Sequence, residues 1–359
     1  MPCRCIFWHC LYHDDDARIY AYVLWKIGRF KNSVGGGAHS DRLFERIISL
    51  ENLFEAWRKF RRGKSAKHDI MKFEWRLEDH VFALHEDLAD GKYQHGPYES
   101  FVVCDPKRRE IHKACVRDRL MHHAIVRVIE PLFERQFIFD SWSCRKGKGT
   151  HRAVERFQRW GWSLSRNNTR TVWVLKLDIR KYFSSVDQEI LRSILSRTIK
   201  EPKLMSLLNN VIGSFGQGLP LGNLTSQLFA NVYLNELDQY AKRIIRVKYY
   251  LRYCDDMLFL DTDPVQLERT LESIRGFLSE HLHLSLHPDK IIFRRYHGID
   301  VLGFICFPHF RLLRTTSKRR LLRRYSAKNA SSYNGLLEYA RTHVLVPKLS
   351  IPILNKPNF

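Results

Sequence analysis

The sequence lacks the features that direct a protein into a membrane or through a secretory pathway. No apolar stretch approaches the roughly 20 residues that a membrane-spanning helix needs. The N-terminus also lacks the charged segment, apolar core and small-residue cleavage site of a signal peptide. The eight cysteines stand at irregular spacings, which argues against a disulfide framework and favours a reducing compartment. We therefore expect a cytoplasmic protein that makes no membrane contact.

Acidic residues are scarce relative to basic ones. The chain has 60 Lys and Arg but only 38 Asp and Glu, a net charge of +22 over 359 residues. Such an excess favours a polyanionic partner, because each phosphate that a protein neutralises releases counterions and adds affinity. Basic clusters occur along the whole length, at residues 58–67, 107–109, 145–148, 242–248 and 318–324. This spread suits a long nucleic-acid channel better than a single basic tail; a solvated basic surface is the alternative.

The first part of the chain divides into an extension and a helical segment. Residues 1–40 are rich in aromatic side chains and end in the flexible run Gly35-Gly36-Gly37, and the sequence assigns them no role. From residue 41 to about residue 160 the apolar spacing is mainly helical. Helices are expected over residues 54–62, 73–89 and 111–130, with a short β-prone run over residues 98–104.

Runs of β-branched and aliphatic residues dominate the chain after residue 170. Strands are expected over residues 171–177, 248–253, 257–260, 291–294 and 301–307, and helices over residues 225–245 and 267–282. A very short acidic link separates the second strand from the third, so these two form a hairpin. The alternation of strands and helices predicts an antiparallel sheet backed by helices, which is an α+β fold.

Three carboxylates stand where the predicted strands end. Asp178 follows the first strand, and Asp255 with Asp256 occupies the hairpin turn. These side chains can converge at one edge of the sheet if the two segments are neighbours. Clustered carboxylates repel one another, so the cluster is costly unless a cation occupies it. Mg²⁺ suits such a site, because it needs few protein carboxylates beside water and substrate phosphates. Two such ions would activate a 3′-hydroxyl and stabilise departing pyrophosphate.

The motifs around these carboxylates resemble those of reverse transcriptases. Tyr253-Cys254-Asp255-Asp256 is similar to the aromatic-x-Asp-Asp signature of that family, and the run from Leu177 to Phe183 resembles its first metal-binding motif. The resemblance covers residues 50–339, with the motifs in the family's order. It implies an RNA-directed DNA polymerase shaped as a right hand, with helical fingers, an antiparallel-sheet palm and a short helical thumb. The expected bounds are residues 41–170 for the fingers, 171–312 for the palm with fingers–palm elements near 200–225, and 313–359 for the basic thumb and tail.

The resemblance also implies roles for individual residues. The catalytic residues would be Asp178, Asp255, Asp256 and Lys290, and the metal ligands Asp178, Ile179, Asp255 and Asp256, holding two Mg²⁺ ions or Mn²⁺ in their place. The incoming nucleotide would meet Arg109, Arg117, Phe183, Leu221, Gly222 and Gln227. The primer and template would meet Tyr253, Gly303, Lys318, Arg319 and Arg323.

Each of these roles has a physical reason and a structural alternative. Phe183 lies five residues after Asp178, where the family places an aromatic gate against a ribonucleotide 2′-hydroxyl; the alternative is a core aromatic. Arginine forms forked contacts to phosphate, yet Arg109 or Arg117 could equally make a structural ion pair. Lys290 would protonate pyrophosphate, or be a solvated lysine at a strand end.

The stretch from Gly218 to Gln227 resembles the reverse transcriptases of diversity-generating retroelements, which copy a template RNA with errors at adenines. Leu221 replaces the glutamine, and Gln227 the proline, of retroviral and many other reverse transcriptases. An apolar side chain removes a hydrogen-bonding group from the pocket of the nascent base pair. We therefore expect looser discrimination between nucleotides.

The resemblance implies several partners and leaves alternatives open. The partners are template RNA, a DNA or RNA primer, deoxynucleoside triphosphates and, for this subfamily, a small basic accessory protein. The alternatives are a phage-defence-associated reverse transcriptase, a catalytically inactive RNA-binding protein with a polymerase fold, and an RNA-dependent RNA polymerase. The intact Asp178, Asp255 and Asp256 argue against an inactive protein, and Phe183 argues against a polymerase that accepts ribonucleotides.

Overall fold

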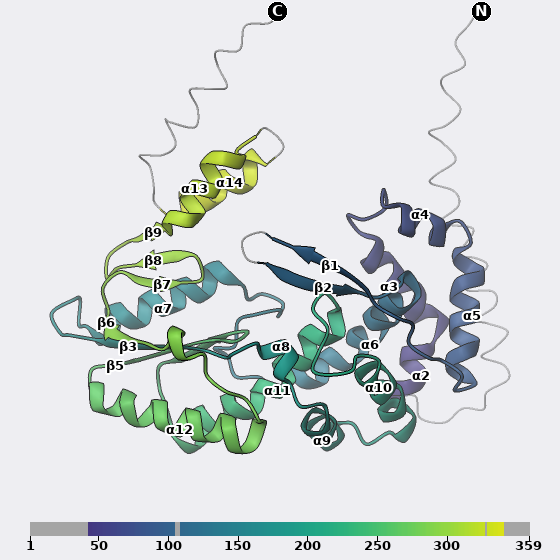
Figure 1. The fold of residues 1–359 in the computed structure, drawn as a ribbon, viewed down its shortest axis with the longest axis horizontal. Coiled ribbons are helices and arrows are strands. Elements are labelled where there is room, and N and C mark those ends of the chain that lie inside the picture. The colour runs from purple at the N-terminus through teal and green to yellow at the C-terminus, as the bar shows by residue number, and fades with distance from the viewer. Residues whose placement is uncertain (1–41, 105–107, 327–328, 341–359) are drawn as a thin grey trace, which may run out of the picture. The chain divides into compact units, whose positions relative to one another are not determined.

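The structure is a computed structural model that describes residues 42–104, 108–326 and 329–340. Figure 1 draws these residues as a ribbon coloured from the N-terminus to the C-terminus. The predicted extension over residues 1–40 lies outside the described residues. Among the described helices, none is both long and apolar enough to cross a membrane.

The chain clusters into two compact units. The first unit holds the described residues up to 135 together with residues 192–229. The second holds residues 136–191 and the described residues from 230 onwards. Residues 136–170, predicted as part of the fingers, therefore group with the sheet. The names fingers, palm and thumb remain predictions.

Helices make up most of the first unit. Its elements are α2 (Leu43–Ile48), α3 (Leu50–Arg61), α4 (His68–Glu74), α5 (Leu77–Ala89), β1 (Glu99–Val103), β2 (Arg109–Lys113), α6 (Val116–Glu134) and α10 (Pro202–Gly213). Helix α3 starts after Ser49, whose hydroxyl accepts from the backbone N–H of Asn52, and it buries Leu53 and Trp57 one turn apart. The Asn52 amide also donates to the Ala124 carbonyl of α6 at 3.1 Å. The core of this unit therefore lies between α3 and α6.

The hairpin of the first unit corrects part of the helical prediction. The run predicted over residues 98–104 is confirmed as β1, but residues 111–113 belong to β2 and were wrongly expected to be helical. The two strands pair with Phe101 opposite Ile111. Cross-strand pairing decides the conformation here, because helical periodicity over three residues carries little information. The helix predicted over residues 73–89 is also two helices, α4 and α5.

The second unit is built on a four-stranded antiparallel sheet (Figure 1). Its strands lie in the order β4 (Tyr250–Tyr253), β5 (Asp256–Asp261), β3 (Trp173–Asp178) and β6 (Ile292–Arg295). A three-stranded sheet holds β7 (Ile299–Val301), β8 (Phe304–Cys306) and β9 (Arg311–Leu313). The helices and helical turns are α7 (Thr150–Leu164), α8 (Tyr182–Ser185), η1 (Tyr240–Ile244), α12 (Pro264–Leu282), η2 (Pro288–Lys290), α13 (Thr315–Arg324) and α14 (Ala330–Tyr339). Helices α9 (Gln188–Thr198) and α11 (Leu224–Gln239) have residues in both units. An antiparallel sheet backed by helices confirms the predicted α+β fold.

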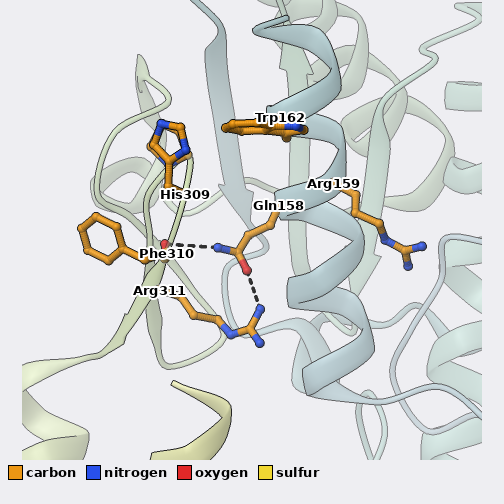
Figure 2. A pocket seen from close by; sticks show the side chains of 7 residues that line it. Gln158, Arg159, Trp162, His309, Phe310 and Arg311 are labelled. Carbon is orange, nitrogen blue, oxygen red and sulfur yellow. Dashed lines mark hydrogen bonds between the residues drawn. The ribbon is translucent and has the colours of Figure 1, made fainter. Parts of the chain in front are cut away.

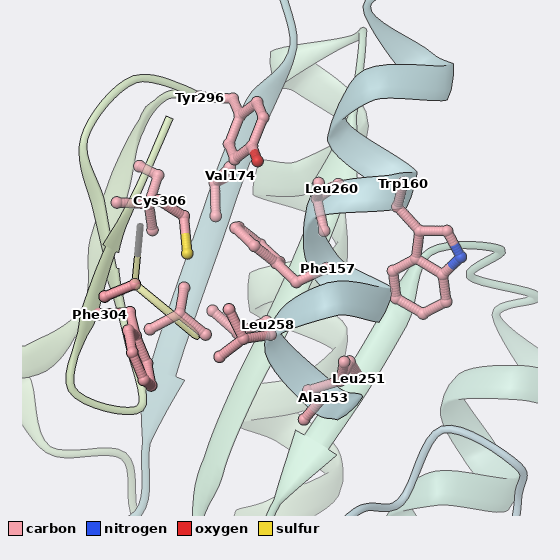
Figure 3. Packing of buried hydrophobic residues seen from close by; sticks show 14 of the residues in the cluster. Ala153, Phe157, Trp160, Val174, Leu251, Leu258, Leu260, Tyr296, Phe304 and Cys306 are labelled. Atoms are coloured by element: carbon pink, nitrogen blue, oxygen red, sulfur yellow. The ribbon is translucent and has the colours of Figure 1, made fainter. Parts of the chain in front are cut away.

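Both faces of the four-stranded sheet are buried. Side chains alternate along a strand, so the cross-strand partners Val174 and Leu260 turn to the same face. There they pack with Phe157 of α7 in a cluster that also holds Phe304 of β8 (Figure 3). Helix α12 packs against β3 and β5 on the other side of the sheet from α7 (Figure 1). Burial on both faces explains why β3 is a nearly continuous apolar run in the sequence.

The strand predicted over residues 301–307 is wrong, because the chain turns in its middle. Leu302 and Gly303 have φ values of 50° and 95°, in the left-handed region that ends β7 at Val301 and starts β8 at Phe304. Glycine adopts such angles without the Cβ clash of other residues. Gly303, which the resemblance assigns to primer and template contact, therefore lies in the turn of a hairpin. The other predicted strands of this unit are confirmed as β3, β4, β5 and β6.

A buried histidine lies in the core of the first unit. His122 of α6 is 2% exposed, with Nδ1 2.8 Å from Thr225 Oγ1 and Nε2 3.2 Å from His95 Nε2. Burial, together with the neighbouring His95, lowers the pKa of His122 to about 3, although the Asp118 carboxylate acts in the opposite direction. The imidazole therefore stays neutral in the folded protein at pH values where it would be charged in the unfolded chain.

We predict that mild acid destabilises the first unit through His122. Because the folded-state pKa is depressed, stability is lost as the pH falls from about 6.5, where the unfolded chain takes up the proton, towards 3. Between pH 7.5 and 5.5 the free energy of unfolding should fall by about 1.4 kcal/mol from this group, measured by chemical denaturation. Over the same pH interval the free energy of unfolding of the His122→Gln variant should fall by less than that of the unmodified protein, and the difference should equal the contribution of His122. An identical pH dependence in the two proteins would contradict the prediction.

Candidate functional site

The three predicted catalytic carboxylates lie at one end of the four-stranded sheet. Asp178 is the last residue of β3 and Asp256 the first of β5, and the antiparallel register makes them direct partners across the strands. Tyr253 pairs with Asp256, so Cys254 and Asp255 form the turn between β4 and β5. Cys254 has a φ of 56°, a left-handed conformation typical of such tight turns. We call Asp178, Asp255 and Asp256 the carboxylate edge.

Burial and repulsion disfavour negative charge at the carboxylate edge. Burial raises the pKa of Asp255, and the carboxylates of Asp256 and Asp178 raise it further. Burial also raises the pKa of Asp256, an effect that Lys176 and Lys290 partly offset. A bound cation would relieve this cost, because it stabilises the ionised form of a carboxylate.

Two lysines supply positive charge at this edge. Lys290, at the end of η2, donates from Nζ to Asp178 Oδ1 at 2.6 Å. Lys176 of β3 has its Nζ 3.7 Å from Asp256 Oδ1 and donates to the Asp300 carbonyl at 3.1 Å. Lys290 was among the predicted residues, but Lys176 was missed. Its signal was a charged residue within an apolar strand, two positions before Asp178 and therefore on the same side of the strand.

The ligand atoms of the carboxylate edge suit a hard divalent cation, but they are not already arranged around a single metal position. Carboxylate oxygens are the ligands that Mg²⁺ prefers, and Ile179 can add only a backbone carbonyl. Within the described part of the chain, no group of three or more Asp, Glu, His or Cys side chains is arranged around one metal position. Asp178 is engaged with Lys290 instead. The residues therefore fit an ion that brings water and phosphate ligands of its own, as Mg²⁺ commonly does.

A buried arginine holds the turn between β4 and β5. Arg252 is 1% exposed, and its guanidinium contacts the Asp238 carboxylate from Nε at 2.8 Å and from Nη2 at 2.7 Å. Nη1 donates to the Cys254 carbonyl and to Asn231 Oδ1, both at 3.2 Å, and Nη2 donates to Ser141 Oγ at 3.1 Å. The network ties the turn to α11 and to the segment before α7. Sequence analysis missed this pair.

One predicted nucleotide-binding residue, Phe183, shares a unit with the carboxylate edge. Phe183 lies on α8, half-buried, with its ring edge-on to Tyr182 at a centroid distance of 5.5 Å. The Tyr182 hydroxyl is buried and donates to the Ala230 carbonyl at 2.6 Å. Tyr182 therefore anchors the short helix that carries Phe183.

Two predicted arginines belong to the first unit and differ in their surroundings. The Arg117 guanidinium forms an ion pair with Asp87 at 2.6 Å and lies over the Tyr93 ring. Arg109 lies in β2 with an exposed side chain. Arg117 therefore makes a structural ion pair, which was the alternative to its predicted nucleotide contact. Arg109 stays accessible to a ligand.

The loop that carries Leu221 and Gly222 is fixed on β2 within the first unit. The Leu221 carbonyl accepts from the His112 N–H at 2.9 Å. Gly222 has a φ of 118°, and a Cβ there would lie 2.9 Å from Ile111 Cγ2, so only glycine fits without a shift. Gln227 follows on α11 and is exposed.

The predicted primer- and template-binding residues all lie in the second unit. The Tyr253 hydroxyl is 3.1 Å from Thr150 Oγ1 at the start of α7. Gly303 lies in the β7–β8 turn. Helix α13 carries the three basic residues, of which Arg319 and Arg323 are exposed and Lys318 is half-buried.

Comparison with known proteins gives one family and several relatives. Residues 104–306 match the family model described as reverse transcriptase (RNA-dependent DNA polymerase). Protein YkfC of Escherichia coli strain K12 is 28% identical over 287 residues, covering 68% of this chain and 74% of that protein. The group II intron-encoded protein LtrA of Lactococcus lactis subsp. cremoris is 23% identical, covering 46% of this chain and 29% of that protein. Nuclear intron maturase 4, mitochondrial, of Arabidopsis thaliana is 24% identical, covering 60% of this chain and 27% of that protein.

Similar solved structures include telomerases at low sequence identity. Apo telomerase from Candida tropicalis, truncated from the C-terminal domain, aligns with a TM-score of 0.46 at 11% identity, covering 62% of this chain and 56% of that one. Telomerase from Candida albicans in complex with a TWJ fragment of telomeric RNA aligns with a TM-score of 0.47 at 10% identity, covering 69% of this chain and 50% of that one. The chain thus spans about half of these telomerase chains and under a third of LtrA.

We predict that Asp238→Asn strongly destabilises the second unit. The substitution leaves the buried Arg252 guanidinium without its counter-charge, which costs about 3–5 kcal/mol. Chemical denaturation measures this loss. The matched control is Glu272→Gln, which removes the same kind of carboxylate from the exposed pair with Arg275 at 2.7 Å and should cost less than about 1 kcal/mol. Equal losses in the two variants would contradict the importance of the buried pair.

Proposed function

The chain belongs to the reverse transcriptases, the family of RNA-dependent DNA polymerases, and on that premise we propose that it copies an RNA template into DNA by two-metal nucleotidyl transfer. The observation that carries the proposal is the pairing of Asp178 with Asp256 across the strands, with Asp255 in the adjoining turn. A binding module has no need to concentrate carboxylates beside a polyanion. The raised pKa values of Asp255 and Asp256 are expected at a site that works with a cation.

The residues at the carboxylate edge have two roles, metal binding and proton donation. Asp178, Asp255 and Asp256 would hold two Mg²⁺ ions, or Mn²⁺ in their place, and Ile179 would contribute its backbone carbonyl. The bound ions supply activation of the primer 3′-hydroxyl and stabilisation of the leaving pyrophosphate. Lys290 donates a proton to that pyrophosphate, and its 2.6 Å contact with Asp178 keeps its ammonium at the edge where it is needed.

Residues proposed to select the nucleotide occur in each unit. Phe183 excludes a ribonucleotide 2′-hydroxyl by its bulk, and the anchoring of Tyr182 to Ala230 keeps the short helix α8 in place. Arg109 contacts the triphosphate, since its exposed guanidinium is accessible whereas that of Arg117 is paired with Asp87. Gly222 and Gln227 line the nucleotide pocket beside Leu221.

The primer and template are held by charge and shape rather than by base identity. Arg319 and Arg323 lie one turn apart on α13, both exposed, and with Lys318 they neutralise backbone phosphates. Tyr253 and Gly303 contact the primer end. Binding of this kind weakens as the salt concentration rises.

The finer part of the proposal is that synthesis is error-prone at template adenines, as in a diversity-generating retroelement. Leu221 supports it, because its apolar side chain offers the nascent base pair no hydrogen bond, while its carbonyl holds the loop on β2. A small basic accessory protein would accompany the enzyme. A phage-defence role predicts the same chemistry with accurate copying.

Primer extension tests the proposal directly. The full chain is given an RNA template, a DNA primer, Mg²⁺ and deoxynucleotides, and the product is sequenced. A product with errors concentrated at template adenines supports both the polymerase and the retroelement reading. Accurate copying supports the polymerase activity and favours the phage-defence role. If no product forms even with native RNA and a candidate partner added, the result favours an RNA-binding protein without polymerase activity.

We predict that Asp255→Asn abolishes synthesis, by at least about 10³-fold, because the ions lose a ligand worth several kcal/mol in the transition state. RNA binding, measured by fluorescence anisotropy, should stay nearly unchanged. The matched control is Asp261→Asn at the opposite end of β5, which should keep its activity. Parallel loss of synthesis and RNA binding in Asp255→Asn would contradict the metal role.

We predict that Leu221→Gln makes copying more accurate opposite template adenine, by about fivefold. The new amide restores one hydrogen bond in the pocket, worth about 1 kcal/mol in discrimination. Sequencing of primer-extension products gives the error rate at each template base, with the rates at cytosine, guanine and uracil as internal controls. An unchanged error spectrum would refute this part of the proposal.

A further inference from the structure

A groove lies between helix α7 and the loop from β8 to β9 in the second unit (Figure 2). Its volume is about 230 Å³, enough for one planar ring system with its substituents and too little for a base pair. Most of its lining comes from Gln158, Arg159, Trp162, His309, Phe310 and Arg311. We call it the α7–β9 groove.

Two aromatic residues at this groove remain exposed although they are held in place; in Figure 2 the Trp162 ring points toward the β8–β9 loop, and the Phe310 ring points away from α7. Trp162 is 37% exposed and Phe310 44%. The Trp162 ring meets His309 edge-on at 4.7 Å, and Phe310 stacks on Phe307 at 4.5 Å. Ordered aromatic surface left open to water is costly and is characteristic of a site that another ring covers.

A hydrogen-bonded glutamine fixes the geometry of the loop. The Gln158 amide donates to the Phe310 carbonyl at 3.1 Å, and its oxygen accepts from Arg311 Nη1, as the dashed lines in Figure 2 show. Arg311 in turn donates from Nε to the Tyr339 carbonyl at 2.8 Å. The groove is therefore built before any ligand arrives, which lowers the entropy cost of binding.

The charge around the groove is positive. Arg159 and Arg311 line it, and none of its lining residues is acidic. Among the described residues Arg159 has no acidic partner; its side chain is exposed and extends from the side of α7 that faces away from the β8–β9 loop (Figure 2). An exposed aromatic face on one side of α7, with an exposed guanidinium on the adjoining side, complements a strand that carries both flat rings and negative charges, as unpaired nucleotides do.

The groove is remote from the carboxylate edge. Thr150, at the start of α7, reaches the Tyr253 hydroxyl beside the catalytic turn. Trp162 lies twelve residues further along the same helix, roughly 18 Å away at 1.5 Å per residue. A nucleotide in the groove is therefore not the nucleotide being incorporated.

We propose that the α7–β9 groove binds an unpaired base of single-stranded RNA, with the base stacked on Trp162 and a neighbouring backbone phosphate at Arg159 on the adjoining side of α7. The inference rests on the proposed function in one respect, since it takes RNA to be the partner of the chain. It adds a second contact point for RNA, outside the site where nucleotides are joined.

Photocrosslinking tests the site in the unmodified protein. The full chain is mixed with an unstructured RNA oligonucleotide containing 4-thiouridine, without primer or deoxynucleotides, and irradiated, and crosslinked peptides are identified by mass spectrometry. Crosslinks in the peptides that contain Trp162 or Phe310 support the proposal. Crosslinks confined to peptides outside the groove, with RNA bound, overturn it and leave the proposed polymerase intact.

Substitution separates stacking from general charge. Trp162→Ala should weaken binding of the same RNA on the order of tenfold, Trp162→Phe should restore most of it, and Trp75→Ala, which removes a tryptophan that is 89% exposed, should not change it. Extension of a short primer–template should be unaffected by Trp162→Ala. Equal RNA binding by Trp162→Ala and Trp75→Ala overturns the proposal. If Trp162→Ala binds RNA normally but loses binding of an acidic peptide that the unmodified chain binds, the groove belongs to a protein partner and the proposal is also overturned. Failure of the wild-type chain both to bind RNA and to extend a primer would refute the proposed function itself.

Discussion

The buried contact between Arg252 and Asp238 is the constraint on which the second unit depends. A charge taken out of water costs several kcal/mol unless its partner and its hydrogen bonds are all in place. Here the guanidinium is surrounded by a carboxylate, the Ser141 hydroxyl, the Asn231 amide and the Cys254 carbonyl. These groups come from separate stretches of chain, so β4, α11 and the segment before α7 must take up their positions together. Because the Cys254 carbonyl is one of the acceptors, the network also fixes the strained turn that presents Asp255, against the repulsion between neighbouring carboxylates.

The palm-like sheet could be predicted because its signals are local. Each strand next to the carboxylates is an apolar run bounded by a charged or turn residue, and two runs with almost nothing between them can form only a hairpin. The β1–β2 hairpin and the turn at Leu302 gave weaker signals. In both places the conformation depends on the strand that pairs alongside, and the spacing of apolar residues carries no information about that pairing. Gly303 was the one local signal for the second of these turns, and the strand pattern over residues 301–307 ignored it.

The candidate site shows the same division. Asp178, Asp255 and Asp256 could be placed from the sequence because strand ends and turns locate them. Asp238 could not, since its partner is fourteen positions away and the pairing depends on how α11 packs under the sheet. Arg117 has the residue type expected at a triphosphate, yet its ion pair to Asp87 depends on the distance between two helices. Side-chain type predicts what a residue can bind, whereas the packing of its element decides what it does bind.

Helix α7 fixes the distance between the carboxylate edge and the α7–β9 groove of the second unit. Its first residue, Thr150, contacts Tyr253 next to the turn that holds Asp255, and its third and fourth turns carry Gln158 and Trp162, which line the α7–β9 groove. Between them Phe157 is completely buried in the cluster that joins the two sheets, so the helix cannot slide without breaking that core. An RNA strand held in the groove is thereby held at a set distance from the carboxylate edge. Lys290 and Lys176 offset charge at that edge, whereas Arg159 has no acidic partner among the described residues. Its exposed guanidinium therefore gives this helix an attraction for phosphate that no internal ion pair reduces.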